Sequence, residues 1–284
     1  MKHIGIFLNP QYVSDEPVFA LLEKLHWEKD INFYNTSPLS TELPAFIPDV
    51  SRLDGFPLNC ILVFGGDGTI LRAVDQSLKY NAPLLGINIG SLGFLSDCSM
   101  QELEKSVDDL IKNRFSVQSR LLLKVQLKRG GKLTFKGLAL NDAVIYKGNV
   151  PKLIDVTISS NRRLVLDTRC DGIVVSTPTG STAYSLSAGG PILSPEMEAI
   201  VITPLNPHVL TVRPIVFSAT DLLRFRIRET TDECILQLDG KNNVAISVED
   251  EVLITAAAQK VRFIKLSNKT FFSILRKKMH LGRK

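Results

Sequence analysis

The chain has 284 residues, of which 44% are hydrophobic and 22% are charged, with 34 Lys and Arg against 29 Asp and Glu. This composition supports about two folded domains and excludes a mainly disordered chain. No apolar run approaches the ~20 residues that span a bilayer. The first apolar run is interrupted by Asn9-Pro10 too early for a signal peptide, so we expect no membrane association.

The net charge of +5 comes from the C-terminus, because residues 265–284 contain seven basic side chains and no acidic one. A solvated basic tail accounts for this charge, and we expect no nucleic-acid partner. The four cysteines are at least 38 residues apart and include no C-x-x-C pair. This spacing argues against a zinc site or a disulfide framework and favours a reducing cytoplasm.

Strand and helix patterns alternate over residues 1–100. Strands are predicted at residues 3–8, 31–34, 60–64 and 83–88. Helices are predicted after a cap at Ser14, with Phe19, Leu22 and Leu25 at helical spacing, and over residues 69–80. This alternation predicts an α/β N-terminal domain with a mostly parallel sheet.

The pattern changes near residue 100. One more amphipathic helix is predicted at residues 101–113 and is followed by short β-like runs separated by tight polar turns. The runs cover residues 121–127, 133–135, 139–146, 154–159, 164–169, 222–227, 234–238, 244–248 and 261–264. We therefore predict a second, predominantly antiparallel β domain over residues 101–264. The basic tail, 265–284, can form a helix at 271–279 that packs back on the N-terminal domain.

The sharpest local motif is Gly65-Gly66-Asp67-Gly68-Thr69, between a buried strand and a helix. Open α/β sheets bind ligands at such turns, where glycines let the backbone approach an anion and the helix N-terminus favours phosphate. Neither common nucleotide-binding fingerprint is present. The alternative is a structural turn in which Thr69 caps the helix. A second glycine loop, residues 86–94, follows the next predicted strand and would open onto the same sheet edge.

Residues 171–191 form a hydroxyl-rich segment, in which eight of the twelve residues from Ser176 to Ser187 carry a hydroxyl. Such a set could line a pocket for a polyhydroxylated ligand, or form a loop with a capped helix. A serine hydrolase is disfavoured, since no G-x-S-x-G elbow occurs. Asn141-Asp142 ends an apolar run, so it is either a ligand contact or a hydrogen-bonded turn.

Taken in order, these segments resemble the NAD kinases. The resemblance rests on residues 65–69, 88–94, 141–142 and 171–191, and the run from Thr177 to Tyr184 is its most specific part. The Gly-Gly-Asp-Gly element alone is shared with phosphofructokinases and diacylglycerol kinases. The resemblance implies transfer of the γ-phosphate of ATP to the 2′-hydroxyl of the adenosine ribose of NAD. It also implies a divalent cation, most commonly Mg²⁺, and a homodimer or homotetramer.

The resemblance further implies site residues. Asp67 would be the catalytic base that orients the acceptor hydroxyl. The dinucleotide would contact Gly68, Arg72, Asn141, Asp142, Lys152, Arg169, Asp171, Thr182, Ala183, Tyr184, Ser185, Leu186, Ser187 and Gln237. Lys152, Arg169 and Gln237 rest on weaker local matches, and the motifs identify no metal ligand or adenine site for ATP.

Two other functions stay open at this point. A lipid kinase of the diacylglycerol type would share the Gly-Gly-Asp-Gly loop, and its basic tail would attract anionic membranes. A sensor would bind NAD or NADP without consuming ATP. The hydroxyl-rich segment suits a polar dinucleotide better than an acyl chain.

Overall fold

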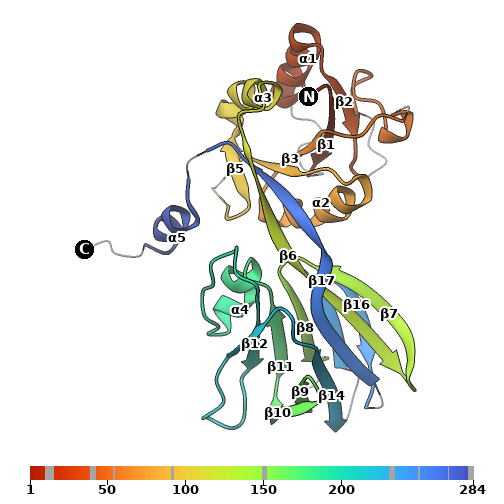
Figure 1. The fold of residues 1–284 in the computed structure, drawn as a ribbon, viewed down its shortest axis with the longest axis vertical. Coiled ribbons are helices and arrows are strands. Elements are labelled where there is room, and N and C mark those ends of the chain that lie inside the picture. The colour runs from red at the N-terminus through yellow and green to blue at the C-terminus, as the bar shows by residue number, and fades with distance from the viewer. Residues whose placement is uncertain are drawn as a thin grey trace. The chain divides into compact units, whose positions relative to one another are not determined.

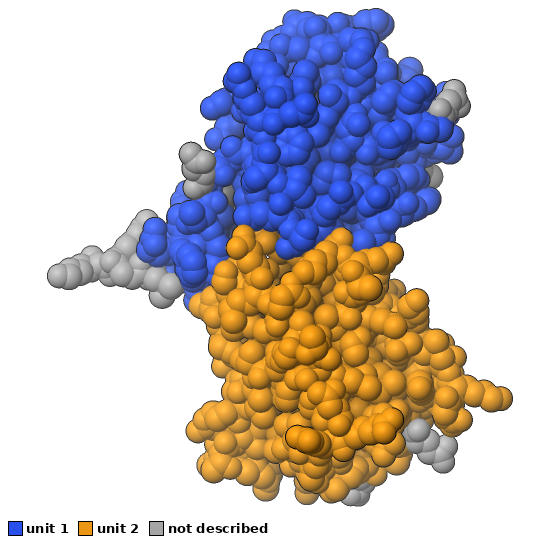
Figure 2. All heavy atoms as spheres, viewed as in Figure 1, with its two compact units in different colours: residues 1–119, 261–284 blue, residues 120–260 orange. Residues whose placement is uncertain are grey.

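The computed structural model describes residues 1–9, 16–38, 43–53, 55–90, 93–148, 152–229, 234–248, 250–267 and 269–280. The chain forms two compact units, residues 1–119 with 261–284 and residues 120–260 (Figure 2). The second unit is thus an insertion within the first. This boundary differs from the expected one near residue 100, because helix α3 (Leu103–Ile111) buries Leu103, Val107 and Leu110 in the core of the first unit.

The first unit is built on a parallel sheet (Figure 1). Its central strands lie in the order β4 (Leu84–Asn88), β3 (Cys60–Phe64), β1 (His3–Leu8) and β2 (Asn32–Asn35). β4 also pairs with β5 (Ser96–Ser99) and, through Leu84 and Phe263, with β17 (Asp250–Lys265). The carboxyl ends of β1, β3 and β4 therefore meet at one sheet edge, the position expected for a ligand site.

Helices cover both faces of this sheet. Alternate residues of β1 and β3, including Ile6 and Leu62, share a core with α1 (Glu16–Lys29) and α3. The residues between them point to the opposite face. There, α2 (Asp67–Tyr80) packs so closely that a Cβ on Gly86 would lie 2.5 Å from Ile70 Cδ1. Both faces are buried, which explains the near-continuous apolar runs in the sequence.

The second unit is a β-sandwich. One sheet has the order β13-β12-β11-β8-β15-β16, and its neighbouring strands are antiparallel. The other contains β10-β9-β14-β17, and β6 pairs with β17 and β7. The inward residues of both sheets form one core. The strand bounds are β6 Ser116–Arg129, β7 Lys132–Ala139, β8 Asp142–Lys147, β9 Ile154–Ser160, β10 Arg163–Cys170, β11 Gly172–Ser176, β12 Ala199–Leu205, β13 Ile215–Ser218, β14 Leu223–Glu229, β15 Cys234–Leu238 and β16 Lys241–Ile246.

The predicted fold class is confirmed: a parallel α/β unit is combined with an antiparallel β unit. Four strands, β5, β11, β12 and β13, and most of β17 were not predicted as strands. The predicted cap at Ser14 lies outside the described residues. Helix α5 (Phe271–Met279) matches its expected range and belongs to the first unit. None of the helices in the described part of the chain is long and apolar enough to cross a membrane.

Candidate active site

The first glycine loop makes the turn from β3 into α2. Gly65 has φ of 149°, and its N–H donates to the carbonyl of Ile87 at 3.0 Å. A side chain at 65 would collide with Thr69, since a Cβ would lie 2.5 Å from its Oγ1. The turn is so tight that α2 begins at Asp67, with Gly66 as its N-cap. Thr69 is therefore not the helix cap that the alternative interpretation assumed, but a buried residue within the first turn.

The carboxylate of Asp67 is held by the second glycine loop. Its Oδ2 accepts a hydrogen bond from the backbone N–H of Phe94 at 2.8 Å, and its Oδ1 accepts one from Leu95 at 3.1 Å. Only a residue without a side chain fits at Gly93 beside this carboxylate, because a Cβ there would lie 1.9 Å from Oδ1. A carboxylate has about four acceptor sites, so each oxygen keeps one for a further hydrogen bond.

Polar side chains lie on the first turns of α2 and just at or after the ends of β1 and β4. Asn9, which follows β1, donates from Nδ2 to Thr69 Oγ1 at 3.2 Å, and Arg72 donates to the same oxygen at 3.3 Å. Asn88, at the end of β4, closes its own turn by accepting from the N–H of Gly90 at 2.9 Å. Asn9 was not among the predicted site residues, and its only signal was a polar residue directly after a buried strand. Ser91 and Leu92 lie outside the described residues.

In the second unit, the Asn141-Asp142 turn is fixed by the carboxylate of Asp239. That carboxylate accepts from the backbone N–H groups of Leu140, Asn141 and Asp142 at 2.7, 2.8 and 3.1 Å. In return, the N–H of Asp239 donates to the carbonyl of Asp142 at 3.0 Å. Asp239 has a positive φ of 47°, which Asp tolerates, in the turn between β15 and β16. The Asp-Gly sequence predicts a turn here but not these bonds to residues about 100 positions away.

The hydroxyl-rich segment holds the same turn from the other side. Thr177 donates from Oγ1 to the carbonyl of Leu140, and its backbone N–H donates to that of Asn141 at 2.9 Å. Gly180 packs on the turn so closely that a Cβ would lie 2.1 Å from the oxygen of Asn141. Asn141-Asp142 is therefore a hydrogen-bonded turn, and its rigidity also suits a ligand contact.

Half of the eight hydroxyls in this segment serve the fold. Ser176, Thr177, Ser181 and Ser185 are fully buried, and each makes a hydrogen bond inside the protein. Ser185, a predicted contact residue, bonds to Thr203 at 2.9 Å. Its neighbours Thr182, Ala183, Tyr184, Leu186 and Ser187 are at least partly exposed, in a short helical stretch that includes α4 (Tyr184–Ser187). Of residues 182–187, these five are accessible to a ligand.

The remaining predicted residues are dispersed over the second unit. Asp171 forms an ion pair with Lys147 and accepts from Asn206 Nδ2 at 2.8 Å. Gln237 donates to Asn243 at 2.8 Å. Lys152 and Arg169 have exposed side chains. Asp67, Gly68 and Arg72 belong to the first unit and all the other predicted residues to the second.

Burial and the charge of Asp239 together raise the pKa of Asp142 to about 7. Burial also raises the pKa of Asp239 above its ordinary value, although three backbone N–H groups oppose this. Two nearby buried carboxyls disfavour double ionisation, so near neutral pH Asp142 is partly protonated. A protonated Asp142 can donate a hydrogen bond as well as accept one.

The raised pKa of Asp142 predicts a pH-dependent stability. Between about pH 4 and 7 the folded chain holds a proton that the unfolded chain releases, so this contribution to stability falls as the pH rises. We expect Asp142→Asn to be more stable than the parent at pH 8, by on the order of 2 kcal/mol, and this gain to be clearly smaller at pH 5, because it vanishes only below about pH 4. Urea unfolding at both pH values measures it, with exposed Asp75→Asn as control. A gain that is equal at both pH values would contradict the prediction.

Within the described ranges, no three or more His, Cys, Asp or Glu side chains are grouped so that they could hold a metal ion. A metal cage made by the protein alone is therefore not formed by these residues. The free acceptor sites of Asp67 fit a Mg²⁺ ion that arrives with substrate phosphates, because such ions commonly use one or two carboxylates and keep several waters.

Comparison with known proteins decides which family this geometry belongs to. Residues 22–115 match the N-terminal domain of the ATP-NAD kinases, and residues 140–266 match their C-terminal domain. An NAD kinase of Acidobacterium capsulatum is 34% identical over 99% of both chains. The chain belongs to the NAD kinase family. An NAD kinase of Desulforamulus reducens is 39% identical over 79% of this chain and 78% of its own. The resemblance seen in the sequence motifs is thus confirmed.

Two solved structures of NAD kinase relatives share the fold. Yeast NADH kinase in complex with NADH superposes with a TM-score of 0.86 at 25% identity, over 100% of this chain and 89% of its own. An NAD kinase from Archaeoglobus fulgidus in complex with ATP gives 0.73 at 25% identity, over 99% of both chains. Family membership decides against the lipid-kinase alternative, which rested on the Gly-Gly-Asp-Gly loop and the basic tail.

Proposed function

We propose that this chain transfers the γ-phosphoryl group of ATP to the 2′-hydroxyl of the adenosine ribose of NAD, giving NADP and ADP. The observation that carries the proposal is the oriented carboxylate of Asp67. It lies at the first turn of α2, next to the carboxyl end of a parallel strand, and two backbone N–H groups hold it while leaving acceptor sites free.

The start of α2 supports binding of the triphosphate. The first N–H groups of a helix lack partners within the helix, and its N-terminus carries a partial positive charge. Gly66 and Gly68 leave open space around this end, since a Cβ on either would meet no described atom within 4 Å. The exposed guanidinium of Arg72 adds a positive charge one turn along the helix.

Asp67 acts on the acceptor hydroxyl. A ribose hydroxyl is a much weaker acid than a carboxylic acid, so Asp67 cannot remove its proton in advance. It orients the oxygen and takes the proton as that oxygen forms its bond to the γ-phosphorus. The bond from this phosphorus to the bridging oxygen breaks, and ADP leaves with the electron pair. Alignment and charge stabilisation supply most of the rate in phosphoryl transfer, so this limited role is sufficient.

A divalent metal, Mg²⁺, belongs to this proposal. Asp67 would hold it together with the phosphates of ATP. When bound, it neutralises charge that develops on the phosphoryl oxygens.

The dinucleotide is assigned to the remaining predicted residues. Hydrogen-bond donors and acceptors for it are offered by the rigid Asn141-Asp142 turn, by the partly exposed residues around α4 and by Asp171. Lys152, Arg169 and Gln237 complete the assignment. The proposal also includes a homodimer or homotetramer, which light scattering measures. The proposal finally places the protein in the cytoplasm, because its four cysteines are buried free thiols.

One assay tests the function. The full chain is incubated with NAD, ATP and Mg²⁺, and the product is coupled to an NADP-specific dehydrogenase. We expect NADP to form only when ATP is present and its formation to stop in excess EDTA. Undiminished activity in EDTA would contradict the metal role. Binding of NAD by calorimetry without ATP consumption would instead support the sensor. Parallel reactions with NADH and diacylglycerol define the acceptor.

A further inference from the structure

Helix α5 (blue in Figure 1) contacts the loop that holds Asp67 through the side chains of Phe271 and Lys278. The ring of Phe271 lies 6.2 Å from that of Phe94, centroid to centroid, at an angle of 41°. The ammonium of Lys278 lies 4.9 Å from the centroid of the same ring. Residues seven positions apart share one face of a helix, so Phe271 and Lys278 can both contact the ring of Phe94.

Phe94 connects this helix to the carboxylate. Its ring is contacted by α5, and its own backbone N–H donates to Asp67 Oδ2 at 2.8 Å. The N–H of the next residue, Leu95, donates to Oδ1. Just before Phe94, Gly93 bonds to Ser96 Oγ at 3.1 Å. A shift of the Phe94 ring therefore moves the N–H groups that orient Asp67.

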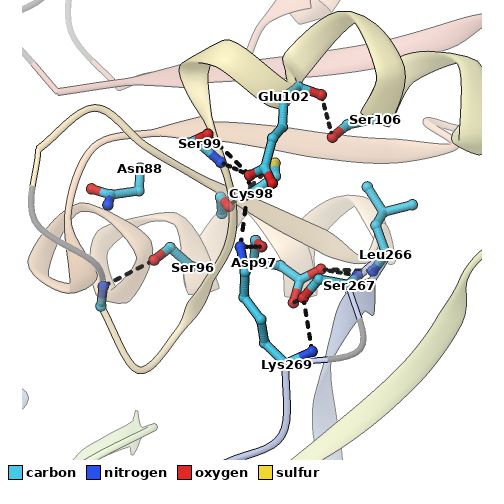
Figure 3. A network of polar contacts seen from close by, with 12 residues as sticks. Asn88, Ser96, Asp97, Cys98, Ser99, Glu102, Ser106, Leu266, Ser267 and Lys269 are labelled. Carbon is cyan, nitrogen blue, oxygen red and sulfur yellow. Dashed lines mark hydrogen bonds and ion pairs between the residues drawn. The ribbon is translucent and has the colours of Figure 1, made fainter. Parts of the chain in front are cut away.

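The buried carboxylate of Asp97 anchors the segment that leads into α5 (Figure 3). Asp97 is 1% exposed and accepts from the N–H groups of Leu266 and Ser267 at 2.6 and 2.9 Å. Lys265 forms an ion pair with it. Burial alone would raise the pKa of Asp97, but Lys265 and these N–H groups outweigh it and lower the pKa. Losing one partner of such a buried charge is costly, so the start of the tail is firmly attached.

Beyond the Asp97 anchor, α5 has only nine residues, too few for an isolated helix to be stable in water. Thr270 caps it by accepting from the N–H of Ser273 at 3.2 Å, and packing must supply the rest. Lys277, adjacent to Lys278, is exposed. Two side chains of the helix, Phe271 and Lys278, contact the ring of Phe94, and each can be replaced separately, while Lys277 offers a neighbouring charge with which to compare Lys278.

We propose that α5 is a positioning element for phosphoryl transfer. Phe271 and Lys278 hold Phe94 where the N–H groups of residues 94 and 95 orient Asp67. This inference rests on the proposed function, because it assigns the effect to the catalytic carboxylate. Neither Phe271 nor Lys278 needs to touch a substrate.

The test compares steady-state kinetics of Phe271→Ala and Lys278→Met with the parent. We expect kcat to fall about 10-fold for Phe271→Ala and about 3-fold for Lys278→Met, as aromatic and cation–π contacts of these kinds imply. The KM for ATP and the melting temperature should stay nearly constant. Lys278→Arg retains the cation and should restore kcat, and Lys277→Ala should not change it.

Several outcomes would overturn the inference. These are parental kcat in both variants, an equal loss in Lys277→Ala, or a loss of kcat that follows the melting temperature. If Phe271→Ala does not fold, the Lys278→Met and Lys278→Arg pair decides alone. Failure of the proposed function gives a different result, because then the parent chain itself forms no NADP.

Discussion

Replacement of Asp67 by Asn is expected to abolish most NADP formation while the chain still folds. Asparagine has nearly the same shape, and its carbonyl oxygen can still accept one of the two N–H bonds from Phe94 and Leu95. It cannot take the proton of the acceptor hydroxyl. Loss of a general base costs about 10²–10⁴-fold in rate, so we expect kcat to fall by that factor.

The measurement for Asp67→Asn is kcat in the coupled assay, with circular dichroism and a melting curve to show folding. Asp75→Asn removes an exposed carboxylate from the same helix and serves as the matched control. Near-parental turnover would remove Asp67 from the mechanism. Rescue of the variant by high Mg²⁺ would instead assign Asp67 chiefly to metal binding.

Gly93→Ala is expected to have the second-largest effect on turnover. It displaces the carboxylate of Asp67 without changing that residue. The added Cβ would lie 1.9 Å from Asp67 Oδ1 and 2.7 Å from its Cγ. The carboxylate is the end of a partly exposed side chain, and its neighbours Gly66 and Gly68 are exposed. It can therefore swing away at a small cost in stability. A displacement of about 1 Å can cost on the order of 10²-fold in rate, and we expect a loss of kcat of that size.

Gly90→Ala is the matched control for Gly93→Ala, because it lies in the same loop and its added Cβ would meet no described atom within 4 Å. Neither glycine has a positive φ, so backbone strain does not separate the two variants. We expect parental turnover for Gly90→Ala and melting temperatures within a few degrees for both. Equal turnover in the two variants would show that the close approach of Gly93 to Asp67 does not matter for catalysis.

Local patterns predicted the first unit best. The buried strand at Cys60–Phe64, its glycine turn and the helix after it are all specified by neighbouring residues. Strand β5 was missed because its sequence, Ser96-Asp97-Cys98-Ser99, is mostly polar. These polar groups can be buried only because the partners of Asp97 arrive from residues 265–267, about 170 positions later. β12 was missed as well, and its Pro204 argues against a strand.

The site was predictable in its segments but not in its contacts. The glycine motif identified Asp67, but the N–H groups that orient it come from 27 and 28 residues away. The hydroxyl-rich segment suggested a pocket lining, yet five of its eight hydroxyl side chains are buried. No local signal distinguishes an inward from an outward hydroxyl in such a loop. Likewise, Asp239 gave only a turn signal, although it fixes the Asn141-Asp142 turn.

The return of the chain to its first unit constrains how the protein can fold on the ribosome. Unit one holds residues 1–119 and 261–284, so its last strand and helix are synthesised after the whole β-sandwich. Until then, Asp97 has neither Lys265 nor the N–H groups of Leu266 and Ser267. An N-terminal domain usually matures first during translation. Here the β-sandwich, which is one continuous stretch of chain, can finish before the unit that began emerging earlier.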